Sequence, residues 1–584
     1  MLYELESFNK KKINKKNFFN PYNVLLKNYK DSDILFEVIK ENKEIKKLTK
    51  SEVKKGSILL ANEILKTLNK KILKKQLKIM CIISASEESL ITMMSSCLLS
   101  AHHCICFEDL SEESIIQRIK LFKPNIILFR SKLEAKIEHI KKLINSDKYK
   151  FLKIDLNLFK INNYQNSLKL FDSIYESHSS LFTLFTSGST GLPKAIVHGG
   201  LDFLKFAKFT TSYYFGIKKG SKIFAAVDSG WINGHTYSFY GPLLIGAKSI
   251  IIEDPLLLTF PVVLSKYIEE LKPDCFYTSV TLLRLIKTIT PKGKNIYDYF
   301  ENKNSDFTLD RIGSCGELLA HSVGKWSMDF FKPKRKSIVN TYFQTETGGV
   351  LIAPRDEDKP PKDYSCVGKP NKHVNIVLAK DIKNKNELRL EGLEPNELLI
   401  SGNCDGIFQK VISDKKQNYF TSKGEFRLHD IGYFDKEGYL FIGGRNDDVI
   451  NVSGHRISSS EIENISMEVE NIDEICAVAF PDKLSGSKVV LFFSSSKSQK
   501  DEHRKISESL NKLIFKKLTK YHLPSSIYYF KNFPKTKSGK ILRRVMRNLI
   551  SNKFDTKKNY SFIANQKDFL ISTEIFLKTY KKHQ

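Results

Sequence analysis

The sequence predicts an α/β protein with a largely parallel sheet in a large N-terminal unit and a smaller α+β unit at the C-terminus. Helical spacing of Leu, Ile and Ala over 57–73 precedes a buried-strand pattern at Lys78–Ser84, and the helix-like stretch 112–121 precedes the strand-like stretch 125–129. Parallel strands need long, usually helical connections, so this alternation favours a parallel sheet. The same strand pattern returns at 221–227, 247–253 and 398–401.

The chain length and a shift in composition predict the domain organisation. A chain of 584 residues is too long for one compact core. The composition changes near Gly443–Asp448, and a smaller unit follows with a helix from about Ser460, strands at 475–480 and 489–494 and a helix at 504–518. We therefore predict a polar, lysine-rich arm over 1–40, a large domain over 41–446 and a small C-terminal domain over 447–584.

The net charge of +29 raises the possibility of a nucleic-acid or membrane-surface partner. The basic runs are short, however, and none alternates with aromatic residues as in a base-stacking surface. We therefore expect a lysine-rich solvated surface and no specific nucleic-acid partner, with a positive field that attracts small polyanions. A hydrophobic share of 41% argues against disorder.

The nine cysteines show no paired framework, which predicts reduced thiols and a cytoplasmic location. His102, His103, Cys104 and Cys106 resemble a metal cluster, but their spacing fits no zinc pattern and their apolar setting favours a packed strand. We expect no membrane span, because no apolar run reaches about 18 residues. The early glutamates argue against a targeting peptide.

A candidate phosphate-binding loop follows the short apolar strand Phe182–Phe185. Gly188 and Gly191 allow a tight turn that brings backbone N–H groups to an anion, and Lys194 adds a cation. The loop also carries four hydroxyl groups, from Thr186, Ser187, Ser189 and Thr190. It is not a Walker A loop, because Pro193 stands where that motif needs Gly-Lys-Ser/Thr. A Ser/Thr/Gly-rich surface turn is the alternative.

Four blocks in this order resemble the adenylate-forming superfamily, and within it the acetyl-CoA synthetases. The blocks are Thr186–His198 (TSGSTGLPKAIVH), Tyr342–Gly349 (YFQTETGG), Asp430–Arg456 with its GRNDDVINVSGHR segment, and Pro534–Ile541 (PKTKSGKI). A weaker block, Gly230–His235 (GWINGH), matches the acyl-pocket segment. The resemblance covers the chain from about Tyr22 onward. It implies a multi-layer α/β adenylation domain and a mobile C-terminal domain.

The resemblance also implies a role for each matched residue. Lys540 would be the catalytic lysine that bridges the acid and the α-phosphate, and Glu346 would hold Mg²⁺. Asp447 would be the hinge, while Ser453 and Gly454 would line the coenzyme A tunnel. The acyl pocket would be formed by Trp231, Ile232, Asn233, Cys315 and Phe343. The implied ATP and AMP contacts are Thr186, Ser187, Gly188, Ser189, Thr190, Gly191, Lys194, Gly316, Glu317, Asn340, Thr341, Tyr342, Phe343, Gln344, Thr345, Asp430, Arg445 and Arg456.

The sequence departs from the family at several of these positions. Phe343 stands where a tryptophan closes the acyl pocket, and Asn340 stands where an aspartate contacts adenine. Ile232, Asn233 and Cys315 replace Val, Thr and Val. Near the coenzyme A nucleotide, Phe-Gly-Gly is replaced by Phe107-Glu108-Asp109, and two acids there would repel phosphates unless nearby lysines compensate.

The function expected from the resemblance is ATP-dependent ligation of a short carboxylate to coenzyme A through an acyl-adenylate, with acetate as the first candidate. Ligation of propionate or another short acid is the alternative. A nucleotide-binding paralogue without activity is a third hypothesis, but Lys540, Arg445 and Glu346 are all retained. The sequence leaves the oligomeric state open.

Overall fold

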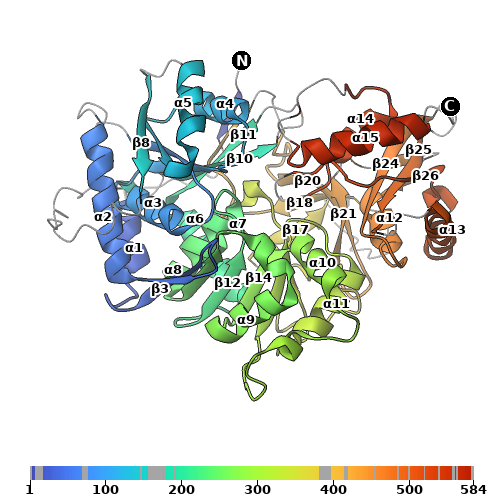
Figure 1. The fold of residues 1–584 in the computed structure, drawn as a ribbon, viewed down its shortest axis with the longest axis horizontal. Coiled ribbons are helices and arrows are strands. Elements are labelled where there is room, and N and C mark those ends of the chain that lie inside the picture. Colours follow the sequence, from blue (N-terminus) through green and yellow to red (C-terminus); the bar gives the residue numbers. More distant parts are fainter. Residues whose placement is uncertain are drawn as a thin grey trace.

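The computed structural model describes most of the chain. The described residues are 3–6, 18–68, 76–144, 148–155, 175–176, 179–187, 193–371, 373–379, 396–413, 418–445, 448, 450–452, 455–482, 486–496, 500–518, 520–536, 539–555, 560 and 563–580. Figure 1 shows the large α/β part with its two main sheets and the smaller C-terminal part, coloured orange to red, packed against one end of it.

An eight-stranded sheet forms one layer of the large part. Its central strands β6, β5, β7 and β8 are parallel, and β10 continues parallel to β6. The predicted strand at His102–Cys106 is confirmed as β6, fully buried. In spatial order the strands are β1 (Tyr3–Glu6), β19 (Lys410–Ser413), β11 (Pro193–Gly199), β10 (Ser180–Ser187), β6 (His102–Cys106), β5 (Lys78–Ile82), β7 (Ile126–Arg130) and β8 (Lys150–Ile154).

A seven-stranded sheet forms the second layer. All its neighbouring strands are parallel except the β3–β4 pair, which is antiparallel. This confirms the predicted largely parallel α/β class. In spatial order the strands are β16 (Val339–Asn340), β15 (Arg311–Cys315), β14 (Cys275–Ser279), β12 (Lys222–Ala226), β13 (Lys248–Ile252), β3 (Ile34–Ile39) and β4 (Ile45–Thr49).

Helices cover the two sheets on both faces. The largest core cluster joins both sheets to α1 (Pro21–Leu26), α2 (Lys50–Thr67), α3 (Glu87–Leu98), α6 (Gly200–Phe215) and α8 (Gly241–Ile245). A second cluster packs α4 (Glu112–Phe122) and α5 (Glu134–Leu143) on the eight-stranded sheet. A third packs α9 (Pro261–Leu271), α10 (Val280–Ile289) and α11 (His321–Phe331) on the seven-stranded sheet. Helix α2 begins earlier than predicted because Thr49 and Glu52 form a capping box.

The predicted arm over 1–40 is wrong for its second half. Residues 20–40 contain α1 and β3, and Leu25, Leu35 and Phe36 are fully buried in the largest core cluster. The lysine-rich stretch 10–16 dominated the composition of residues 1–40 and hid the two apolar segments 22–26 and 34–39.

The C-terminal end of the large part is a four-stranded antiparallel sheet. It consists of β17 (Asn375–Leu378), β18 (Asn396–Ser401), β20 (Phe426–Phe434) and β21 (Leu440–Arg445). The last sheet then begins at β22 (Ile450–Val452), so the strands divide close to the predicted boundary, which itself remains a prediction. Short strands β2 (Phe18–Phe19) and β9 (Tyr175–Glu176) pair with each other elsewhere.

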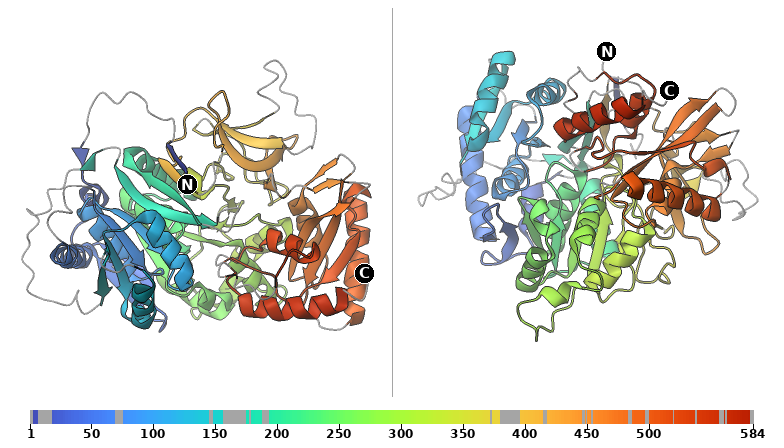
Figure 2. Two further views of the ribbon diagram at one scale, coloured as in Figure 1. Left: turned by 90° about the horizontal axis from the view of Figure 1, so that it is seen from above. Right: turned by 45° about the vertical axis from the view of Figure 1, so that its right-hand side comes forward.

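The C-terminal part is a five-stranded sheet with helices on both faces, as Figure 2 shows. Its strands are β22, β23 (His455–Ile457), β24 (Glu474–Asp482), β25 (Gly486–Ser494) and β26 (Ser526–Tyr529). Helices α12 (Ser459–Ser466) and α13 (Lys500–Lys517) pack on one face, and α14 (Arg543–Ile550) and α15 (Gln566–Tyr580) on the other. The predicted elements of this part agree with α12, β24, β25 and α13.

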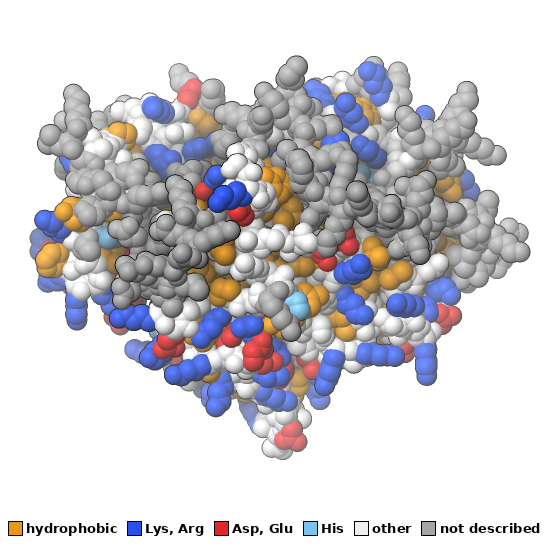
Figure 3. Space-filling model, turned by 180° about the vertical axis from the view of Figure 1, so that it is seen from behind, with side chains coloured by type: hydrophobic (Ala, Val, Ile, Leu, Met, Phe, Trp, Pro, Cys, Tyr) orange, Lys and Arg blue, Asp and Glu red, His pale blue; other side chains and the backbone are white. Residues whose placement is uncertain are grey.

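Positive charge is spread over the face seen in Figure 3, where Lys and Arg side chains lie among neutral and acidic ones. Among the described residues, none of the helices combines the length and apolar character needed to cross a membrane.

Candidate active site

A buried ion pair lies where the phosphate loop meets the Tyr342–Gly349 segment. The Nζ of Lys194, on β11, lies 2.5 Å from Oε1 of Glu346 and 2.6 Å from the hydroxyl of Tyr419. Burial alone would raise the pKa of Glu346, but Lys194 and then Arg445 lower it to about 2. Glu346 is therefore ionised at neutral pH. Next to it the buried Oγ1 of Thr186 has no protein partner, so oxygen ligands for a hard cation or a phosphate are available here.

A second carboxylate, Asp430, is positioned by the antiparallel pairing of β20 and β21. Asp430 and Arg445 are cross-strand partners, and their side chains approach to 3.5 Å. Tyr342 donates its hydroxyl to Oδ2 of Asp430 over 2.7 Å, and Gln344 donates its Nε2 over 2.6 Å. The preceding His429 has a φ of 55°, a left-handed conformation that is uncommon outside glycine and often found at functional sites.

The residues assigned to the adenine side lie at the ends of β15 and β16. Gly316 has a φ of 88° and open space where a side chain would stand. Glu317 pairs with Arg284 and accepts the hydroxyl of Thr281 over 2.5 Å, so it is not a free surface acid. Asn340 is buried: its amide donates to the carbonyl of Cys366 over 2.9 Å and accepts from Ser314. Thr341 donates its hydroxyl to the Ser314 carbonyl over 2.6 Å.

The loop of Lys540 lies against the large part. Thr536 donates its backbone N–H to the Lys540 carbonyl over 2.9 Å, and Lys540 donates its N–H to the Thr536 hydroxyl oxygen over 3.2 Å. Lys535 and Ile541 form a β-bridge beside them. Gly539, with a φ of 82°, packs so closely on the first turn of α10 that a Cβ would lie 2.8 Å from Thr281. Lys540 is exposed at the surface of the hairpin. Desolvation lowers the pKa of its ammonium, and the positive charges of Arg543 and Arg445 lower it further. The carboxylates of Asp430 and Glu317 act in the opposite direction. The amine therefore lies in the electrostatic field of Asp430 and Arg445.

The residues assigned to the acyl pocket gather at α7 (Ile232–His235) and the end of β15. Phe343 packs against the core cluster that contains Ile232 and against the one that contains Cys315. The Asn233 side chain hydrogen-bonds the Cys315 thiol. Trp231 stacks on Phe107 with ring centroids 4.9 Å apart. Phe343 thus borders the two clusters that contain Ile232 and Cys315, while the described contact of Trp231 is with Phe107.

Comparisons with known proteins identify the family of the chain. Residues 31–409 match the AMP-binding enzyme family, and residues 461–540 match the AMP-binding enzyme C-terminal domain. The chain belongs to the family of AMP-binding enzymes.

Among its relatives, acetyl-coenzyme A synthetase 1 of Debaryomyces hansenii is 33% identical over 67% of this chain and 57% of that protein. The acetyl-coenzyme A synthetase of Helicobacter acinonychis is 29% identical over 86% of this chain and 78% of that protein. The match thus spans a little over half of the first relative's length. An anthranilate CoA ligase in complex with anthranoyl-AMP has the same fold, with a TM-score of 0.75 at 16% identity over 92% of this chain and 98% of that one.

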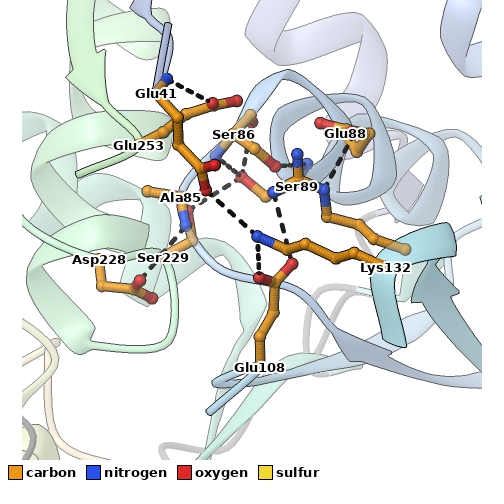
Figure 4. A network of polar contacts seen from close by, with 11 residues as sticks. Glu41, Ala85, Ser86, Glu88, Ser89, Glu108, Lys132, Asp228, Ser229 and Glu253 are labelled. Atoms are coloured by element: carbon orange, nitrogen blue, oxygen red, sulfur yellow. Dashed lines mark hydrogen bonds and ion pairs between the residues drawn. The ribbon is translucent and has the colours of Figure 1, made fainter. Parts of the chain in front are cut away.

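Glu108, which the sequence placed near the coenzyme A nucleotide, does not stand as a free charge in this AMP-binding enzyme. It is buried, and its carboxylate lies 2.7 Å from Lys132 (Figure 4) and 3.4 Å from Arg130. Lys136 donates to its backbone carbonyl over 2.9 Å. The compensation by neighbouring cations that the sequence left open is therefore present for Glu108. Asp109 is exposed.

Asp228 lies beside this network, and the sequence did not single it out. Its carboxylate accepts N–H groups from Gly230 over 2.7 Å and from Ala85 over 3.3 Å, which ties the acyl-pocket segment to the loop after β5. Figure 4 shows the contact with Ala85. Burial raises its pKa to about 6, those hydrogen bonds oppose the shift, and Asp109 and Glu108 add to it. The only sequence sign was its place two residues before the Gly230–His235 block.

Two further contacts were missed. His198 is buried. Its Nε2 donates a hydrogen bond to the carbonyl oxygen of Thr345 over 2.6 Å. Burial lowers its pKa to about 4, so the ring is neutral and its proton stays on this bond. His198 ends the first motif, which could have indicated it. Tyr419 bonds both Lys194 and Glu346, and no sequence pattern marked it.

Several predicted site residues lie outside the described part of the enzyme. These are Gly188, Ser189, Thr190 and Gly191 of the phosphate loop, the hinge residue Asp447, and Ser453 and Gly454 of the coenzyme A segment. The backbones of Ser187 and Arg456 are described, as parts of β10 and β23, but their side chains are not.

Proposed function

We propose that this AMP-binding enzyme ligates a short carboxylate, with acetate as the first candidate, to coenzyme A through an acyl-adenylate. Propionate and other short acids are the alternative substrates. The observation that supports the proposal is the packing of the Lys540 hairpin on the large part, where Gly539 lies against Thr281 and Thr281 donates its hydroxyl to Glu317. Four separated segments thus supply charges to one site.

In the first half-reaction a carboxylate oxygen attacks the α-phosphorus of ATP, the acyl-adenylate forms, and pyrophosphate leaves. Both reactants are anions, so their approach needs cations aimed at the oxygens that gain charge. Lys540 would bridge the acid and the α-phosphate, and Arg445 would contact ribose and phosphate. Asp430 offers two acceptor oxygens to the vicinal ribose hydroxyls.

Mg²⁺ would be held by Glu346 together with phosphate oxygens. The fit is supported by the ionised carboxylate and by the unpartnered hydroxyl of Thr186. Among the described residues no three potential His, Cys, Asp or Glu ligands gather, which suits a metal that keeps water and substrate oxygens as ligands. The ion would neutralise phosphate charge. Lys194, now paired with Glu346, would be free to turn to a phosphate.

In the second half-reaction the coenzyme A thiol attacks the acyl carbonyl, the thioester forms, and AMP leaves. The resemblance assigns this step to a second pose, in which a hinge at Asp447 brings Ser453 and Gly454 to the site. Rotation about few residues suffices for such a change.

All nine cysteines of the chain are free and buried, which supports the proposal of a reducing, cytoplasmic location.

The test is a pyrophosphate-release assay on the full chain with ATP, magnesium and acids of two to six carbons, with and without coenzyme A. We expect acid-dependent release, thioester formation only with coenzyme A, and the highest rates for the shortest acids. Gly454→Leu should leave adenylation intact and block thiol transfer. Nucleotide binding without acid-dependent pyrophosphate release would point to the inactive paralogue instead.

A further inference from the structure

One buried polar atom at the acyl-pocket segment lacks a hydrogen-bond partner. Asn233 is 5% exposed, and its Oδ1 is without a protein partner. A buried amide oxygen that has lost its water is costly unless something donates to it. The resemblance assigns a threonine to this position. The Asn233 amide therefore puts a carbonyl-type oxygen, which only accepts, where a hydroxyl could both donate and accept.

The orientation of the amide follows from its neighbour. The Cys315 thiol donates to the carbonyl of Thr278 over 3.4 Å, which leaves its sulfur to accept. Burial raises the pKa of Cys315 to about 12, and hydrogen bonds from Tyr277 and Asn233 oppose this, as donors to sulfur would. The Nδ2 of Asn233 therefore faces Cys315. The oxygen Oδ1, on the other side of the amide, is the atom that remains.

We infer that Asn233 makes this enzyme select short acids that carry a hydroxyl group on carbon 2 or carbon 3, with the hydroxyl donating to Oδ1. The inference rests on the proposed adenylate-forming function and on the assignment of the acyl pocket. An acyl group held beside Phe343, Ile232 and Cys315 would bring its first carbons close to the Asn233 amide.

The chemistry favours a hydroxyl over an ammonium group. The other four residues assigned to the pocket are Trp231, Ile232, Cys315 and Phe343, and none carries a negative charge. A neutral amide oxygen satisfies a hydroxyl, whereas a buried cation would need a carboxylate. A polar wall atom also discriminates more strongly than a change of one methylene, because the acid without the hydroxyl leaves the atom unpaired.

The first experiment compares glycolate with acetate and lactate with propionate in acid-dependent pyrophosphate release by the unaltered chain. We expect kcat/KM to be at least about ten-fold higher for the hydroxylated acid of each pair. A kcat/KM for acetate equal to or above that for glycolate would overturn the inference and leave the proposed function standing. Absence of release with every acid would overturn the proposed function itself.

The second experiment uses Asn233→Leu, which keeps the shape but removes the acceptor. The ratio of kcat/KM for glycolate to kcat/KM for acetate should fall at least about ten-fold, because only the hydroxylated acid loses a hydrogen-bond partner. The matched control is Thr92→Val on α3, which removes another buried oxygen without a partner, and should leave the ratio unchanged. An unchanged ratio in Asn233→Leu would refute the role of the amide. The comparison in the unaltered chain keeps the test decisive if that variant does not fold.

Discussion

The adenylation site and the Glu108 network place buried charges in opposite ways. At the adenylation site Glu346, Asp430, Lys194 and Arg445 come from different segments, and each could exchange its protein partner for a substrate group. In the network of Figure 4, Glu108 is enclosed by Lys132 and Arg130, which hold it as part of the scaffold. The ion pairs of the adenylation site can thus open to bind substrate groups, whereas the ion pairs of Glu108 connect parts of the scaffold.

Loss of the mobile cation should give the largest effect. In Lys540→Ala we expect adenylation to fall by about a thousand-fold, because this ammonium is the cation proposed to bridge the acid and the α-phosphate. Thioester formation from supplied acyl-AMP should persist. Pyrophosphate exchange and acyl-AMP consumption measure the two steps separately.

Lys531→Ala offers a matched control, because Lys531 is exposed and shortly precedes the same hairpin in the sequence. It should leave both steps unchanged. Exchange that survives in Lys540→Ala would remove this lysine from the reaction.

Glu346→Gln should reduce adenylation by about a hundred-fold, because the metal ligand is weakened and Lys194 loses its partner. The variant also tests stability. The pKa of Glu346 is about 2, below its ordinary 4.5, so its contribution is present above pH 4.5 and is lost as the pH falls toward 2. The full shift corresponds to about 3 kcal/mol.

Urea unfolding at pH 5 and pH 3.5 measures this contribution. The free energy of unfolding of the unaltered enzyme should drop more between these two values than that of Glu346→Gln. Equal drops in the two proteins would mean that the ion pair does not stabilise the fold.

The same contrast explains what the sequence could and could not predict. The strands with unbroken apolar runs, such as β5 and β6, were predictable because buried parallel strands need such runs. Motif residues such as Lys194 and Glu346 were predictable because a motif fixes their local backbone. Their pairing at 2.5 Å across 152 residues was not, since it depends on how β11 and the 345–347 turn pack together.

The misses share a physical reason. Glu108 was expected to need compensation, but its partners Arg130 and Lys132 follow a different strand, β7, and only the parallel order β6-β5-β7 brings the strand ends together. Residues 20–40 were assigned to an arm because the lysine-rich stretch before them outweighed two short apolar segments that tertiary packing buries. Asp228 binds only backbone N–H groups, which no side-chain pattern records.

A change in the network should act on the thiol step alone. In Glu108→Gln a negative charge is removed and Lys132 and Arg130 are partly released. If the coenzyme A nucleotide binds here, as the resemblance implies, its KM should fall about three-fold, more at low salt than at high salt. Pyrophosphate exchange without coenzyme A should not change.

Glu113→Gln provides the control, because Glu113 is exposed on α4 and has the same charge. A KM for coenzyme A that is unaffected by Glu108→Gln would separate the network from the thiol substrate. The two regions would then differ in function as well as in structure.

Asp228 links the two regions, and its replacement should have the smallest effect. Its ionised carboxylate holds the N–H groups of Gly230 and Ala85, so protonation below about pH 6 should loosen the acyl-pocket segment and raise the KM for the acid about two- to five-fold. Asp228→Asn should show the raised KM at every pH, because its amide can accept only one of the two bonds well. Asp202→Asn, an exposed aspartate on α6, is the control.

As the pH falls, the free energy of unfolding should rise while acid binding weakens. This opposite response distinguishes a positioning role of Asp228 from a general loss of structure. Because the pKa of Asp228 is raised from 3.8 to about 6, its contribution to stability is fully present below pH 3.8 and is lost as the pH rises through 6. Acidification from pH 7 to pH 5 should therefore stabilise this site while it weakens acid binding. If KM and unfolding free energy instead worsen together in that range, and Asp228→Asn does not alter either trend, the carboxylate is not the group that holds the acyl-pocket segment.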